Sequence, residues 1–253
     1  MSSPMDWVWF GVAVIVIGAA VYWDWQRRKK LIARMTAAAR QRGWTYEAKR
    51  QSLCRAYRGA PFKSSHNSEK AEHVITGTYR DRQFIAFQYR YKMDEDERRR
   101  QREREHRRHP LNLPSVLGGR RRESDHKHSE WRYYHVYAVS LPATRPFLEV
   151  SKEGLFRGVL DAVGIRDLQL ESEEFNKTYK LKTDNNKFAY DILHPRMMEW
   201  MLNDGRVKKF GFTYQGNEIW TYRQGRFKLE DTTDYLDYLH RILERAPSFV
   251  WKD

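Results

Sequence analysis

The feature that most constrains this chain is an uncharged run close to its amino terminus. Residues 7–23 read WVWFGVAVIVIGAAVYW, which is 17 residues without a charge between Asp6 and Asp24. As a helix this run would extend about 25 Å, slightly less than the ~30 Å hydrocarbon core of a bilayer. Aromatic residues that favour the headgroup region lie at both ends and are expected to supply the missing length. These predicted membrane-interface residues are Trp7, Trp9, Tyr22, Trp23 and Trp25. Residues 7–25 are therefore predicted to form a transmembrane helix.

The charges on either side of the run predict its orientation. Residues 1–6 contain no Lys or Arg, whereas seven lie between Trp25 and Arg42. Basic segments stay on the cytoplasmic side, so residues 1–6 are expected to be an external amino terminus and everything after Trp25 to be cytoplasmic. A cleaved signal peptide is disfavoured, because it needs positive charge before its apolar stretch and a small-residue cleavage site after it. The single cysteine, Cys54, is consistent with a reducing compartment.

The segment after the predicted span continues with good helix formers. Residues 26–42 contain neither Gly nor Pro and are predicted to form a basic juxtamembrane helix that ends near Gly43. Residues 43–253 contain no second uncharged run of comparable length. They are expected to form one cytosolic α+β domain, in which two or three helices pack on an antiparallel sheet of six to eight strands.

Alternating apolar residues predict the strands in the first half of this domain. Four strands are expected, over residues 74–79, 84–91, 131–141 and 147–150, because β-branched and aromatic residues alternate there with polar ones. His135 falls on an aromatic strand face, where a structural histidine is a better interpretation than a catalytic one. In the last third the pattern predicts a helix over 153–163, a strand over 179–182, helices over 188–193 and 195–205, a hairpin at 215–217, and a final helix capped within 231–234.

Between Tyr91 and Trp131 the composition changes abruptly. Ten Arg and only two acidic residues lie between Arg98 and Arg122, and apolar residues are few. Such a segment cannot bury enough apolar surface to offset the entropy lost on ordering. Residues 92–130 are therefore predicted to be a disordered basic insertion between two paired strands.

Recognised catalytic and metal-binding patterns are missing from the sequence. There is no phosphate-binding glycine loop and no nucleophile elbow, and the pairs His106/His109 and His126/His128 stand among arginines that oppose metal binding. No catalytic residue, metal ligand or cofactor is predicted, and the chain is not expected to be an enzyme. One alternative stays open: an enzyme whose site is built from distant residues such as His135, Asp191 and His194.

The charge pattern favours an acidic partner. The net charge is +14, from 47 basic and 33 acidic residues. The predicted contacts with an anionic surface are Arg27, Arg28, Lys29, Lys30, Arg98, Arg99, Arg100, Arg107, Arg108, Arg120, Arg121 and Arg122. We expect a membrane-anchored interaction domain, in contact with the lipid bilayer, that binds an acidic protein or anionic lipid. Nucleic acid is a less favoured partner, because no aromatic residue interleaves with the arginines. Taken alone, a solvated spacer is the most favoured single interpretation of the insertion.

The carboxy-terminal half contains a set of characteristic segments: Leu141-Pro142, Phe147–Val150, Leu170–Asn176 with Tyr179, Phe188-Ala189 and Leu193–Met197. Through these segments it resembles a group of uncharacterised bacterial single-pass membrane proteins of unknown function. The resemblance covers about residues 131–250, roughly half of the chain. It implies a bacterial inner-membrane setting but assigns no chemistry to any residue. The arginine-rich insertion departs from the family pattern.

Overall fold

One long strand, β4 (Trp131–Lys152), organises the sheet in this computed structural model, which describes residues 4–62, 68–95, 97–100, 103, 131–152 and 166–252. The first half of β4 pairs with β3 (Arg82–Lys92), and its second half pairs with β6 (Tyr179–Thr183). Along its other edge β4 pairs with β7 (Phe212–Gln224) over nearly its whole length. The two halves of the sheet are therefore one continuous structure.

Seven strands form this sheet within the described residues, and every pairing is antiparallel. The strand order is β1-β2-β3-β4-β6-β5, with β7 beside β4. The remaining strands are β1 (Thr45–Lys49), β2 (Lys70–Tyr79) and β5 (Arg166–Leu168). The helices are α1 (Pro4–Arg40), α3 (Glu173–Thr178), α4 (Asn186–Ile192), α5 (Pro195–Asn203), α6 (Val207–Phe210) and α7 (Thr232–Arg245), with short 3-10 helices η1 (Gln51–Arg55) and η2 (Ser248–Trp251).

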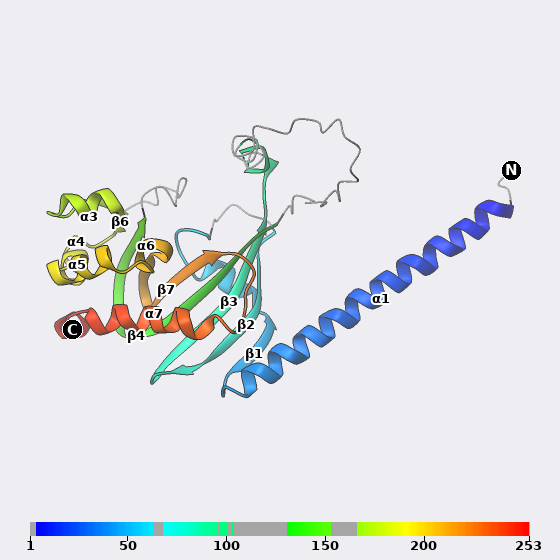
Figure 1. The fold of residues 1–253 in the computed structure, drawn as a ribbon, viewed down its shortest axis with the longest axis horizontal. Helices are drawn as coiled ribbons and strands as arrows, with labels where there is room; N and C mark the ends of the chain where they lie inside the picture. The colour runs from blue at the N-terminus through cyan, green and yellow to red at the C-terminus, as the bar shows by residue number, and fades with distance from the viewer. Residues whose placement is uncertain are drawn as a thin grey trace, which may run out of the picture.

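The α-helices cover one face of the sheet, and η1 with the segment that follows it covers the other face. Helices α3–α7 gather beside β4, β6 and β7 (Figure 1). The stripe of α7 that the sequence predicts to be apolar is buried in the larger core: Tyr235, Leu236, Leu239, Ile242 and Leu243. The opposite face buries an aromatic cluster beneath η1 and the segment that follows it. There the Gln215 side chain holds this segment, because it donates to the Ala56 carbonyl at 3.0 Å and accepts from the Arg58 amide at 2.9 Å.

The prediction of a transmembrane helix over residues 7–25 is wrong. Residues 7–25 and 26–42 lie mostly in one continuous helix, α1, which extends away from the sheet (Figure 1). No helix among the described residues is long and apolar enough to cross a membrane. The physical reason lies in the length of the uncharged run. Its 17 residues fall short of the ~20 that a span needs, and Asp24 and the basic residues follow at once. The expected single-pass placement in an inner membrane, with residues 1–6 outside, loses its basis.

Two strand predictions are also corrected. The strands expected over 131–141 and 147–150 are one strand, because β4 runs through Pro142 and Pro146 with register irregularities against β7 between Ser140 and Leu148. The hairpin expected at 215–217 does not form. Instead β7 continues through Gly216, whose φ of +58° accommodates the irregular pairing opposite Arg145. The helix expected over 153–163 lies outside the described residues, as does most of the predicted disordered insertion at 92–130.

Gly211 joins α6 to β7 in a conformation that only glycine adopts readily. Its φ is +62° and its ψ is −178°, and a Cβ placed there would lie 2.5 Å from the Val150 carbonyl oxygen. We expect Gly211→Ala to lower the free energy of unfolding by about 3 kcal/mol or more, from backbone strain and this clash together. Urea unfolding measures the loss.

Gly216→Ala is the matched control for this substitution. Gly216 also has a positive φ, of +58°, but a Cβ there meets nothing within 4 Å. Its cost should be backbone strain alone, about 1 kcal/mol. Equal losses in the two variants would show that the contact with β4 does not matter.

Candidate anion-binding surfaces

The middle of α1 presents aromatic rings and basic groups together on its surface. We call residues 21–32 the aromatic–basic segment. The side chains of Tyr22, Trp23 and Trp25 are 60%, 64% and 48% exposed. The Arg27 guanidinium lies 4.7 Å from the centre of the Trp23 ring, and the Lys29 ammonium lies 3.6 Å from that of Trp25. Residues four apart lie on the same face of a helix, so the sequence itself sets up these cation–π contacts.

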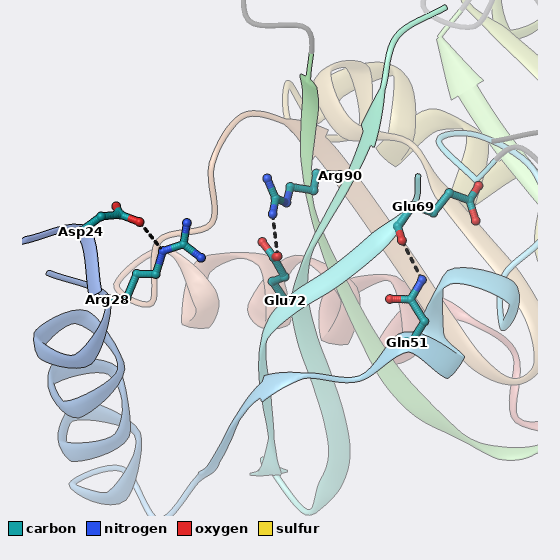
Figure 2. Close-up of polar contacts among 6 residues, drawn as sticks. All are labelled: Asp24, Arg28, Gln51, Glu69, Glu72 and Arg90. Atoms are coloured by element: carbon teal, nitrogen blue, oxygen red, sulfur yellow. Dashed lines mark hydrogen bonds and ion pairs between the residues drawn. The ribbon is translucent and has the colours of Figure 1, made fainter. Parts of the chain in front are cut away.

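Only part of the charge in this segment is balanced. Arg28 donates to the Asp24 carboxylate at 2.8 Å, one turn away on the same helix (Figure 2). Within the part of the chain that the structure describes, no ion pair joins Arg27, Lys29 or Lys30 to an acidic side chain. Three cations therefore remain available for an anionic partner. Of the other predicted interface residues, Trp9 is 68% exposed, and the Trp7 side chain lies outside the described residues.

The carboxy-terminal end of α1 is the part that packs against the sheet. Ala39 is buried, and the Trp44 ring that follows the helix contacts Phe84 of β3 with ring centres 5.0 Å apart. Gly77 of β2 makes room for Trp44, since a Cβ there would lie 2.6 Å from the indole. The aromatic–basic segment thus extends outward from a firmly packed base.

The arginine-rich segment is only partly described. The Arg98 guanidinium lies 3.9 Å from the Glu95 carboxylate, and that of Arg99 lies 3.2 Å from the Glu103 carboxylate. Arg100 is exposed. The other predicted contacts, Arg107, Arg108, Arg120, Arg121 and Arg122, lie outside the described residues. Lys92 pairs with Trp131, so the segment leaves β3 and returns to β4 at neighbouring positions.

A second group of stacked cations lies at this end of the sheet. We call it the sheet-end cluster, and it comprises Lys70, Arg90, Trp131, Tyr133 and Arg226. Above the Trp131 ring stand the Arg90 guanidinium, 4.5 Å from its centre, and the Lys70 ammonium at 5.3 Å. The Arg226 guanidinium lies 4.6 Å from the centre of the Tyr133 ring. All five residues are half-buried or exposed.

Glu72 fixes the position of Arg90 within the cluster. The Arg90 guanidinium donates to the Glu72 carboxylate at 2.7 Å, from β3 to the neighbouring strand β2 (Figure 2). Burial alone would lower the pKa of Arg90, but the hydrogen bonds and charges of Glu72 and Tyr133 outweigh it and raise the pKa. Arg90 is therefore held in place, whereas Lys70 and Arg226 have no ion pair to a carboxylate in the described part.

Sequence reasoning missed the sheet-end cluster. Its members come from β2, β3, β4 and the turn after β7, and the pairing of Lys70 with Arg90 and of Arg90 with Tyr133 brings them together. The alternation of Trp131, Tyr133 and His135 showed that these rings share a face. It could not show which cations lie over them, because strand order and register are long-range properties.

The histidine-based enzyme site does not assemble. The His135 ring lies 5.2 Å from Tyr235 near the start of α7, whereas His194 Nε2 lies 3.3 Å from the Arg245 carbonyl oxygen at its end. Ten helical residues separate these contacts, about 15 Å. Among the described residues, Asp191 makes no hydrogen bond to His135 or His194. In the described part no group of three or more His, Cys, Asp or Glu residues could hold a metal ion. Burial raises the pKa of the Cys54 thiol to about 11, so it stays protonated at neutral pH.

Comparisons with known proteins identify the fold but no family. No protein family matches this chain, and no curated protein matches it either. A solved structure with a similar fold is the crystal structure of the mycobacterial trehalose monomycolate transport factor A, TtfA. The TM-score is 0.52 at 12% identity, over 86% of this chain and 96% of that chain. This similarity concerns the fold alone. The resemblance to uncharacterised bacterial membrane proteins stays a prediction.

Buried histidines predict how stability depends on pH. Burial lowers the pKa of His135 to about 4, with Asp231 opposing and Arg223 and Lys228 reinforcing the shift. Between about pH 6.5 and 4 the unfolded chain binds a proton here and the folded chain does not. The stability from the neutral ring is complete above about pH 6.5 and falls as the pH approaches 4, by roughly 3 kcal/mol in all.

Urea unfolding of the wild type and of His135→Gln across this range tests the assignment. In the variant, the slope of the free energy of unfolding against pH should be smaller than in the wild type. The difference should reach about 1.4 kcal/mol per pH unit at its steepest, the value for one proton. A smaller slope should remain, because burial also lowers the pKa of His73 and His240. Identical slopes would show that His135 titrates normally in the folded chain.

Proposed function

We propose that this chain is a non-enzymatic interaction domain that binds an anionic lipid surface through the aromatic–basic segment of α1. The observation that carries the proposal is the stacking of Arg27 on Trp23 and of Lys29 on Trp25, with both indole rings largely exposed. Indole rings settle at the depth of lipid headgroups, and the cations beside them face lipid phosphates. Residues two apart are about 200° apart around a helix, so Trp25 and Lys29 form one such aromatic–basic pair and Trp23 and Arg27 form another on the opposite side of α1.

Exposed aliphatic side chains in the same segment support a lipid partner. Val21 and Ile32, which are 64% and 39% exposed, lie on the same side of the helix as Trp25, and Leu31, which is 46% exposed, lies nearer the side of Trp23 and Arg27. Apolar side chains gain free energy at the boundary between headgroups and acyl chains, where a charged nucleic acid surface offers them no counterpart. Each Lys or Arg near anionic lipid adds about 1 kcal/mol. Arg27, Lys29 and Lys30, the three cations of this run without an acidic partner in the described part, then provide an attraction that depends on salt.

Vesicle co-sedimentation of the full chain tests this function. Binding to vesicles of phosphatidylcholine with phosphatidylglycerol should exceed binding to pure phosphatidylcholine, and should weaken as salt is added. The double variant Arg27→Gln/Lys29→Gln should lose on the order of tenfold in affinity for the anionic vesicles, because two cations at the interface are removed.

The matched control is Lys187→Gln/Arg196→Gln, which removes the same charge from exposed positions on α4 and α5. It should bind as the wild type does. Equal losses in both variants would reduce the effect to net charge, and equal binding to neutral and anionic vesicles would refute the proposal.

A further inference from the structure

We propose that the sheet-end cluster is a separate docking site for an acidic segment of a partner protein. This proposal does not rest on the lipid interface of α1, because it concerns different residues in a different part of the fold. Three observations support it: the distance of the cluster from α1, its unbalanced charge, and the way its aromatic rings are already occupied.

The cluster lies at the far end of β3 from the base of α1. Trp44, next to α1, contacts Phe84 near the start of β3, whereas Lys92 at the end of that strand pairs with Trp131. The eight residue steps from 84 to 92 correspond to about 27 Å along a strand. A partner at the cluster can therefore bind without touching the packed base of α1.

The charge of the cluster selects an anionic partner. Among the residues that the structure describes, Glu72 is the one acidic side chain that forms an ion pair with Lys70, Arg90 or Arg226, and it is bonded to Arg90. Carboxylates on a partner would restore the balance at Lys70 and Arg226 and form charge-assisted hydrogen bonds with them.

The occupied ring faces favour a protein over a nucleic acid. Single-stranded nucleic acids gain affinity when their bases stack on open aromatic faces. Here Arg90 and Lys70 lie over Trp131, and Arg226 lies over Tyr133. The exposed Arg226 guanidinium can bind a carboxylate in two-pronged fashion while it stacks on Tyr133, whereas the Arg90 guanidinium already donates to Glu72. Half-exposed Trp, Tyr and Arg together are also the side chains that contribute most at protein–protein interfaces.

The test uses the full chain with a fluorescent polyglutamate peptide as the probe. Lys70→Gln/Arg226→Gln should weaken binding at least tenfold, because both uncompensated cations of the cluster are lost. Each side chain is partly or fully exposed, so the substitutions leave the cores intact. Lys187→Gln/Arg196→Gln, with the same change in charge, and Arg27→Gln/Lys29→Gln on α1 should both bind the peptide as the wild type does.

Three results would overturn the proposal. The first is no measurable binding of the peptide, and the second is an equal loss in the cluster and control variants. The third is tighter binding of a single-stranded oligouridylate of matched charge together with a loss of that binding in Trp131→Ala, which would assign the cluster to nucleic acid. Failure of the vesicle experiment leaves these outcomes unaffected, because the two experiments use different variants and different probes.

Discussion

The structure depends on the continuity of β4. This single strand pairs with β3 and β7 through its first half and with β6 and β7 through its second half. A strand bends without losing its partner when the irregularities of both strands fall at the same place. Here the register shifts between Ser140 and Leu148 lie opposite the segment around Gly216. One sheet therefore serves two cores, one under the helices and one under the segment after η1.

Aromatic packing on both faces makes this sheet a rigid support. On the helical face Tyr137 of β4 stacks on Tyr235 of α7, with parallel rings 4.3 Å apart. On the other face Trp220 of β7 contacts Tyr57 and Phe62 with ring centres 5.4 Å and 5.6 Å away. Aromatic pairs of this geometry contribute about 0.5–1.5 kcal/mol each beyond their burial. Such packing fixes the ends of the strands, and so fixes where Trp131 and Tyr133 lie.

Local sequence patterns predicted most helices and strands, but they did not predict how the strands pair over long distances in the sequence. Asn185 accepts from the Phe188 amide at 2.9 Å and Pro195 begins α5, so the capping signals placed these helices correctly. The hairpin predicted at 215–217 was wrong, because a glycine with positive φ occurs at a β-bulge as well as in a hairpin turn. The two strands expected over 131–141 and 147–150 likewise turned out to be one strand, β4. The error at the amino terminus had another source: aromatic flanks were allowed to extend an uncharged run that is too short by itself.

The two candidate surfaces also differ in whether a local sequence pattern or long-range strand pairing brings their residues together. The stacking of Arg27 on Trp23 follows from a spacing of four residues within one helix, so the sequence already placed these groups together. The sheet-end cluster needs the register of three strands and was not visible before the fold was known. Both surfaces place cations on aromatic rings, and both leave part of that charge without a carboxylate in the described residues.

The central claim is that these are two separate surfaces held apart by one rigid sheet. Co-sedimentation with all components present tests it directly: full chain, phosphatidylglycerol-containing vesicles and labelled polyglutamate peptide. The account predicts that the peptide sediments with vesicles only when the protein is present, and that the peptide does not release the protein from them. Displacement of the protein by the peptide would contradict it, because both anions would then be competing for the same basic groups.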